Sequence, residues 1–112
     1  MTSQVQMSET EAIIQEAVRR LIEAAHPTQI ILFGSYARGE QNKDSDLDLL
    51  VIVPNVTNRH DEMVRLRRSL ARLPVPIDVV VYSMDEVEKR RALKGTMLNH
   101  ALREGRVLHA SA

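Results

Sequence analysis

Two short stretches of the sequence carry residue types that could hold a metal ion and a phosphate group. Asp46 and Asp48 open an apolar run, and ten residues separate Asp46 from Gly34-Ser35, which ends an earlier apolar run. In a β-strand, residues two apart point to the same face, so the two carboxylates are expected to project side by side. Adjacent carboxylates repel each other unless a cation or a proton lies between them. Because Mg²⁺ binds carboxylate oxygens and leaves room for substrate phosphates, the pair indicates a Mg²⁺ site.

The Gly34-Ser35 pair has the features of a phosphate-binding turn. Glycine lets the backbone approach a ligand closely and adopt torsions that other residues avoid. If Ser35 opens a short helical turn, expected over residues 36–40, its free amide groups and its hydroxyl point towards a bound anion. Ser35 could also cap that turn, and this role is compatible with phosphate binding. Phosphate at the turn and metal at the carboxylates would together hold a nucleoside triphosphate along its polyphosphate.

Asp78 is a third carboxylate near the start of an apolar run. Aspartate is a poor strand former and is costly to bury, so its place beside a buried strand needs a reason. It could bind a second metal ion, since two ions stabilise both the attacking and the leaving oxygen. It could instead accept the proton of an attacking hydroxyl group. A local role also stays open, because Pro76 precedes Asp78 and an acid can end a turn.

Several basic and polar residues are further candidates for contacts with the nucleotide. Arg38 could reach a phosphate or a partner protein, or it could face solvent from a short helix. Lys43 and Ser45 could touch phosphate, or they could be plain loop residues. A basic cluster suggests RNA or an acidic protein surface, although a solvated helix face is favoured because the same helix offers an apolar side inward. The cluster comprises Arg65, Arg67, Arg68 and Arg72.

The first element that must support these residues is an amphipathic helix. Residues 1–7 are expected to be a loose tail. Ser8 and Glu11 have the spacing of a capping box, which predicts a helix over residues 9–25 with one apolar stripe. Pro27 ends this helix, because proline disfavours helical geometry in the residue before it.

Three apolar, β-branched runs are expected to form buried strands over residues 29–33, 47–53 and 77–82. If the glycine-serine turn faces the aspartate pair, the first two strands are antiparallel. For the third aspartate to join them, the second and third strands must be parallel, and the amphipathic segment 59–73 is long enough for the crossover. The fold class is therefore α/β (α+β), a small mixed sheet flanked by helices. The remaining elements expected are helices from Ser83 towards Leu93 and over residues 96–104, and a short strand over residues 106–109.

The length and composition of the chain indicate which classes of protein it can belong to. A chain of 112 residues is most simply one domain, and 15 basic residues balance 15 acidic ones. Without net positive charge, strong unspecific nucleic-acid binding is not expected. The sequence has no cysteine, no apolar stretch of the roughly 20 residues that span a bilayer, and no apolar secretory signal. A cytoplasmic protein without a membrane partner is therefore expected.

At these residues the chain resembles the nucleotidyltransferases of the DNA polymerase β superfamily. Their signature is Gly-Ser, ten intervening residues and Asp-x-Asp, which here are Gly34-Ser35 and Asp46 with Asp48. Asp78 fits the third carboxylate of that superfamily. The resemblance implies the polymerase β-like nucleotidyltransferase fold, two Mg²⁺ ions, and transfer of a nucleoside monophosphate from a triphosphate such as ATP to an acceptor hydroxyl group.

More narrowly, the chain resembles the minimal nucleotidyltransferases (MNT), including the MntA-type antitoxins. Residues 33–39 and the compact length fit that group, and the resemblance covers residues 29–108. Members of the group are commonly antitoxins paired with HEPN-domain ribonuclease toxins, and some add AMP to a tyrosine of the toxin. The resemblance thus implies a Mg²⁺-dependent, ATP-using antitoxin enzyme that forms a hetero-oligomer with a HEPN toxin and neutralises it.

Two other functions stay open from the sequence. The chain could be a binding antitoxin that inhibits its partner by forming a complex, with catalysis incidental. It could also transfer nucleotide to a small molecule such as an aminoglycoside. The single minimal domain expected over residues 1–112 disfavours the second alternative, because little remains to wall an acceptor site and a protein acceptor would bring its own surface.

Overall fold

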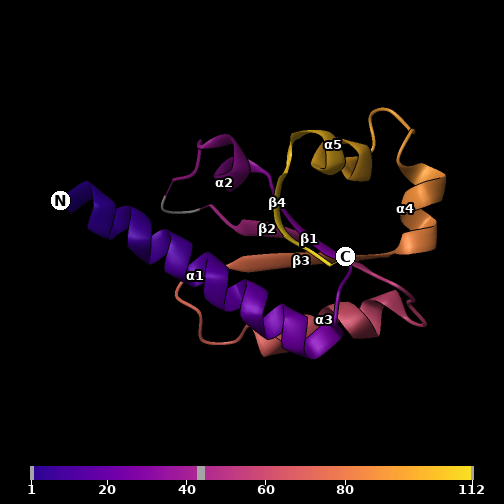
Figure 1. Cartoon of the computed structure of the whole chain (residues 1–112), viewed down its shortest axis with the longest axis horizontal. Coiled ribbons are helices and arrows are strands. Elements are labelled where there is room, and N and C mark those ends of the chain that lie inside the picture. Colours follow the sequence, from indigo (N-terminus) through magenta and orange to yellow (C-terminus); the bar gives the residue numbers. More distant parts are fainter. Residues whose placement is uncertain (1, 43–44, 112) are drawn as a thin grey trace.

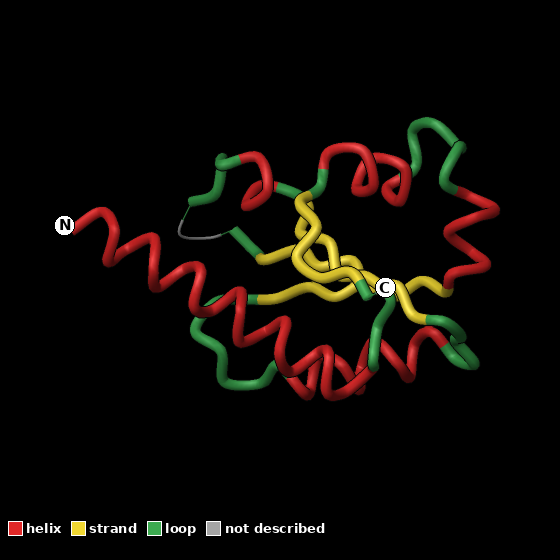
Figure 2. Tube along the Cα trace, viewed as in Figure 1, coloured by secondary structure: helices red, strands yellow, loops and turns green. Residues whose placement is uncertain are grey.

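The described residues, 2–42 and 45–111, form one mixed sheet of four strands in the computed structural model (Figure 1). The strands are β1 (Gln29–Phe33), β2 (Leu47–Val53), β3 (Ile77–Ser83) and β4 (Arg106–Ala110). Their order across the sheet is β3-β2-β1-β4, with helices above and below them in Figure 2. β1 runs antiparallel to β2 and to β4, whereas β2 and β3 are parallel. The predicted small mixed sheet is confirmed, including both strand directions at its centre.

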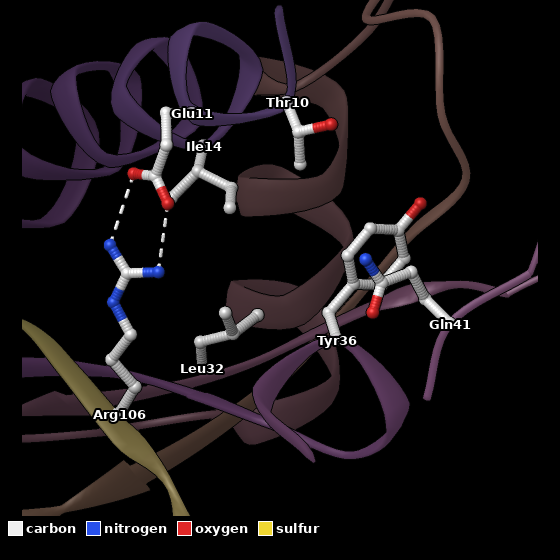
Figure 3. A pocket seen from close by; sticks show the side chains of 7 residues that line it. All are labelled: Thr10, Glu11, Ile14, Leu32, Tyr36, Gln41 and Arg106. Carbon is white, nitrogen blue, oxygen red and sulfur yellow. Dashed lines mark hydrogen bonds and ion pairs between the residues drawn. The ribbon is translucent and has the colours of Figure 1, made fainter. Parts of the chain in front are cut away.

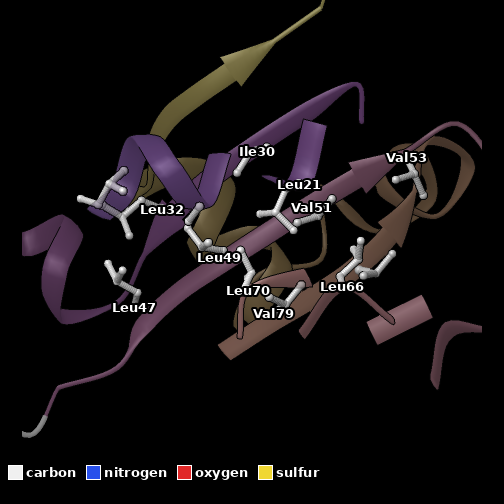
Figure 4. Close-up of a cluster of buried hydrophobic side chains, with 13 residues drawn as sticks. Leu21, Ile30, Leu32, Leu47, Leu49, Val51, Val53, Leu66, Leu70 and Val79 are labelled. Carbon is white, nitrogen blue, oxygen red and sulfur yellow. The ribbon is translucent and has the colours of Figure 1, made fainter. Parts of the chain in front are cut away.

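Helices cover both faces of the sheet. Among the described residues they are α1 (Thr2–Ala25), α2 (Ser35–Arg38), α3 (Arg59–Ser69), α4 (Met84–Arg90) and α5 (Met97–Glu104). α1 and α3 pack on one face and contribute to the larger apolar cluster, part of which Figure 4 draws. α4 and α5 pack on the other face around a smaller cluster. α2 lies at the edge of the sheet where β1 ends (Figure 1).

β2 is buried on both faces, as its continuous apolar sequence predicts. Leu49 and Val51 belong to the cluster under α1 and α3, while Leu50 and Ile52 belong to the cluster under α4 and α5. Each fully buried aliphatic side chain of this size contributes about 1.5–3 kcal/mol to stability. Asp48 is the one residue of β2 that is not fully buried. The strand that carries this carboxylate is therefore held firmly on both sides.

α1 is longer than the sequence predicts. It begins at Thr2, so the prediction of a loose tail is wrong for residues 2–7, and so is the prediction that the helix begins at residue 9 after a cap at Ser8. The physical reason is that the stretch contains neither glycine nor proline, and nothing in it opposes helical geometry. The helix ends at Ala25, as Pro27 predicts. Neither α1 nor any other helix in the described residues is long and apolar enough to cross a membrane.

α3 connects the parallel strands β2 and β3, which confirms the predicted crossover. The helix ends at Ser69 and not at Leu73. Arg72 adopts a left-handed backbone conformation with φ of 73°, and Pro74 follows, so the chain turns before the helix can continue. The turn returns the chain to the edge of the sheet at which β2 also begins.

α4 begins with a capping box at Ser83, where the sequence predicts the start of a helix. The Ser83 hydroxyl accepts a hydrogen bond from the Glu86 amide at 3.1 Å, and the Glu86 carboxylate accepts one from the Ser83 amide at 3.0 Å. We expect Ser83→Ala to lower the free energy of unfolding by about 1 kcal/mol, because it leaves the first turn without its cap. Urea denaturation measures this change. Ser69→Ala is the control, since that hydroxyl only donates to the Leu66 carbonyl within a helix; equal losses in both variants would contradict the prediction.

Two methionines lie partly at the surface of the α4 and α5 side. Leu98 is buried, with 2% of its surface exposed, but Met84 and Met97 are each 40% exposed. Each methionine is the first residue of a short helix, and residues further along these helices, such as Val87 and Leu98, face the core instead. Together with Leu93, which is 54% exposed, the two methionines leave apolar surface on the α4 and α5 side.

Candidate active site

One edge of the sheet gathers the predicted site residues, because β1 ends there and β2 and β3 begin there. Phe33, the last residue of β1, pairs with Asp48 in the antiparallel register. Asp48 in turn pairs with Asp78 in the parallel register. Gly34 follows Phe33 directly, and Asp46 precedes β2 by one residue. The two strand directions predicted from the sequence therefore bring the turn and the carboxylates to the same edge.

Gly34 is required by the position of Asp48. Its backbone has φ of 77° and ψ of −155°, a region that is essentially restricted to glycine. A Cβ atom placed on Gly34 would lie 2.2 Å from Oδ2 of Asp48. The carboxylate thus packs directly against the glycine backbone. The sequence argument assigned the glycine to close approach of a ligand, and the structure adds that its nearest neighbour is a carboxylate of the site itself.

Asp48 lies in a setting that opposes its negative charge. Partial burial raises the pKa of its carboxyl group, and the negative charges of Asp78 and then Asp46 raise it further. The positive charge of Arg38 acts in the opposite direction. A carboxyl group that is desolvated and faces other carboxylates is stabilised by a nearby cation. The donor chemistry therefore fits a hard divalent ion such as Mg²⁺.

The raised pKa of Asp48 predicts how stability changes with pH. In the folded state its ionisation costs more than in the unfolded chain, so stability falls as the pH rises from the ordinary value of 3.8 through the folded-state pKa. Without divalent cations, we expect Asp48→Asn to be more stable than the wild type at neutral pH and to lose that advantage as the pH approaches 3.8. Urea denaturation across this range measures it, with the exposed Asp61→Asn as control. A less stable Asp48→Asn protein at neutral pH would contradict the prediction.

The phosphate-binding candidates occupy the turn and the loop that follow Gly34. Gly34 is the N-cap residue of α2, so Ser35 is the first helical residue and does not cap the turn. The guanidinium of Arg38 pairs with Glu40 at 2.7 Å and acts electrostatically on Asp48. The Ser45 hydroxyl accepts a hydrogen bond from the backbone amide of Asn42 at 2.9 Å, which supports its role in shaping the loop. Lys43 lies outside the described residues.

Asp78 has a partner that the sequence did not reveal. Nη2 of Arg67 on α3 lies 2.6 Å from Oδ1 of Asp78. The sequence assigned Arg67, with its neighbours, to a solvated helix face. Arg65 instead binds Glu62 and the carbonyl of Ala24. A single sequence gives no signal for the Arg67 contact, because it depends on which side chain of the crossover helix faces the start of β3.

The carboxylates share an edge, but they are not yet arranged as a complete set of metal ligands. Among the described residues, no three acidic or histidine side chains form a group that could hold a metal ion. Asp78 is engaged by Arg67, whereas Asp46 is exposed beside Asp48. Joint metal binding by Asp46, Asp48 and Asp78 therefore stays a prediction, which the charge environment of Asp48 supports.

A pocket of about 310 Å³ lies between α1, α2 and the sheet (Figure 3). Tyr36 lines this pocket together with Leu32 and Ile14. Across the pocket, Arg106 forms two hydrogen bonds to Glu11, of 2.8 and 3.0 Å. This ion pair connects β4 to α1 at the rim of the pocket, so these two pocket residues have a structural role.

Comparison with known families identifies the family to which the whole domain is similar. The sequence profile described as the nucleotidyltransferase domain matches residues 12–107. A protein of Methanocaldococcus jannaschii, provisionally named a protein adenylyltransferase, is 38% identical over 82 residues, which cover 72% of this chain and 77% of that protein. The match therefore spans most of both chains.

Solved structures show the same fold. A toxin–antitoxin structure with AMP-PNP has a TM-score of 0.61 at 21% identity, covering 87% of this chain and 73% of that one. A structure described as a minimal nucleotidyltransferase has a TM-score of 0.52 at 28% identity, covering 92% of each chain. The arrangement of strands and helices is thus that of nucleotidyltransferase folds.

Proposed function

This chain belongs to the nucleotidyltransferase domain family, and we propose that it transfers AMP from ATP to a hydroxyl group of a partner toxin. The observation that carries the proposal is the sheet edge where the Gly34 backbone packs against Asp48 and Asp48 lies level with Asp78. Such an edge offers a turn for phosphates beside carboxylates for cations. The negative charges of these carboxylates repel one another in the protein without ligand, but they would bind the metal ions that accompany a triphosphate.

The carboxylates have distinct roles in this proposal. Asp46 and Asp48 project from the same end of β2 and would hold Mg²⁺, with Asp78 contributing to a second ion. Bound Mg²⁺ would offset phosphate charge and stabilise the attacking and leaving oxygens. Gly34 keeps the Asp48 carboxylate close to the turn, because no side chain intervenes between them. The position of the carboxylate is therefore built into the backbone.

The transfer step needs an acceptor for one proton. The acceptor oxygen forms a bond to the α-phosphorus of ATP, the bond to the bridging oxygen breaks, and pyrophosphate leaves. In the alternative to holding a second ion, Asp78, 46% exposed at the edge, would accept the proton of the attacking hydroxyl group from a substrate outside the protein.

The turn residues would bind the triphosphate. The Ser35 hydroxyl forms no hydrogen bond with the residues that the structure describes, so it is free to donate to a phosphate oxygen. Arg38 would exchange Glu40 for phosphate, which is favourable because a guanidinium binds phosphate through charge-assisted hydrogen bonds. Ser45 would contribute through the shape of the loop and through direct contact once the nucleotide is bound.

The partner is proposed to be a HEPN-domain ribonuclease toxin that accepts AMP on a tyrosine. The fold shared with a toxin–antitoxin structure containing AMP-PNP supports a toxin partner and an adenine nucleotide. The name of the archaeal relative supports a protein as the acceptor. The HEPN domain and the tyrosine follow from the resemblance to MNT antitoxins. We place the reaction in the cytoplasm, where ATP is available.

Co-expression with a HEPN-domain toxin proposed as the partner of this chain tests the proposed function. We expect the wild type to restore growth, and Asp46→Asn/Asp48→Asn to fail although it still copurifies with the toxin. Asp61→Asn, an exposed acid away from the edge, should protect like the wild type. If the double variant protects fully, the antitoxin acts by complex formation, an alternative that the exposed apolar surface of Met84, Leu93 and Met97 favours.

A further inference from the structure

Arg67 forms an ion pair with Asp78, the third carboxylate of the site, and so places a positive charge beside it. Arg67 lies near the C-terminal end of α3, and its Nη2 is 2.6 Å from Oδ1 of Asp78. We propose that Arg67 occupies the carboxylate oxygen at which a divalent cation would bind, and so sets the affinity of the site for that cation. The inference rests on the proposed function, because it takes Asp78 as a metal ligand.

The contact between Arg67 and Asp78 is not needed for packing. Their side chains are 47% and 46% exposed, and ion pairs of this kind contribute little to folding. α3 and its C-cap residue are attached to the sheet by apolar side chains, of which Leu66 and Leu70 are buried. The ion pair could therefore open without loosening the helix. A contact that is short, exposed and dispensable for the core is well suited to exchange with a ligand.

The charges around Asp78 explain why a counter-ion is present. Asp78 lies level with Asp48 on the neighbouring strand, and Asp46 lies two residues before Asp48. Like charges in such proximity destabilise one another. The guanidinium of Arg67 offsets part of this repulsion when no metal is bound.

A divalent cation would compete with Arg67 in two ways. It would take the same carboxylate oxygen, and its positive charge would repel the guanidinium. Binding therefore requires the ion pair to open. Because exposed ion pairs change equilibria by about two- to fivefold, removing Arg67 should tighten cation binding by about two- to fivefold. The residue is a positioning residue, since it acts on the metal site through Asp78.

The proposal is tested by titrating the metal-free protein with Mn²⁺ in the absence of nucleotide and measuring the heat of binding in a calorimeter. We expect Arg67→Gln to lower the dissociation constant by about two- to fivefold. Arg68→Gln is the matched control, because it removes one exposed charge from the same helix and its side chain makes no ion pair or hydrogen bond in the described part of the chain. Arg67→Lys keeps the charge and should bind like the wild type. Thermal unfolding confirms that each variant is folded.

A double-mutant cycle isolates the contact itself. In an Asp78→Asn background, the effect of Arg67→Gln should disappear. Equal or weaker Mn²⁺ binding by Arg67→Gln than by Arg68→Gln would overturn the proposal. If Arg67→Gln binds no more tightly than Arg68→Gln, but the wild type binds Mn²⁺ and Asp48→Asn does not, the proposed function stands and only the role of Arg67 is refuted. If the wild type and Asp48→Asn bind equally or not at all, both proposals fail.

Discussion

Replacing Gly34 by alanine should reduce nucleotide transfer by at least about 100-fold, since displacing a catalytic group by about 1 Å can have this effect. The added Cβ atom would lie 2.2 Å from Oδ2 of Asp48, so the carboxylate or the turn must move. The backbone torsions are also strained for alanine, which should lower the free energy of unfolding by about 1–3 kcal/mol. Transfer rates and urea denaturation measure the two effects.

Gly39→Ala provides the control for the Gly34 prediction. Gly39 also has a positive φ, 71°, but a Cβ atom there would meet no atom within 4 Å. We expect a loss of about 1–2 kcal/mol from the left-handed backbone, with transfer largely retained. If both variants lose transfer to the same degree, backbone strain in α2 and not the displacement of Asp48 would explain the effect.

Asp48→Asn should reduce transfer by at least about 10³-fold while leaving the fold intact or more stable, because a site carboxylate contributes on this scale to catalysis. The residue lies at the centre of the edge, between the Gly34 backbone and Asp78. Asparagine keeps the shape of the side chain but removes the charge that a cation would bind. Opposite effects on activity and stability are the signature of a group that is placed for function at a cost to the fold.

Single-turnover transfer and urea denaturation of the same Asp48→Asn preparation would measure both effects. Asp61→Asn, which removes an equal charge from the exposed start of α3, should change neither by much. An Asp48→Asn protein with full activity would contradict the assignment of this carboxylate. A strongly destabilised variant would contradict the electrostatic account of its environment.

Much of the architecture was predictable because the patterns are strong. The strand β2 is apolar at all but one position, and it is flanked by a polar loop and Pro54, so both its bounds are predicted correctly. The chemical requirement that Asp78 join Asp48 then predicted the parallel pairing of β2 with β3. Function-bearing residues thus supplied topological information that hydrophobic patterning alone could not.

Other features could not be predicted, for physical reasons. The capping-box spacing at Ser8 is favourable locally, but a helix passes through it because the preceding residues also tolerate helical geometry. The ion pair between Arg67 and Asp78 depends on the rotation of α3 against the sheet, to which a local pattern is insensitive. The packing of Gly34 against Asp48 likewise depends on cross-strand register, since thirteen residues lie between the two in the sequence.

The central claim is that this edge transfers AMP to a protein, and the most direct measurement follows the α-phosphate. The chain and its partner toxin are incubated with Mg²⁺ and ATP labelled on either the α- or the γ-phosphate, and the label on the toxin is counted. We predict label from the α-phosphate alone, its loss in Asp46→Asn/Asp48→Asn, and its retention in Asp61→Asn. Absence of α-label from the toxin, or equal labelling by the wild type and the double variant, would contradict the account.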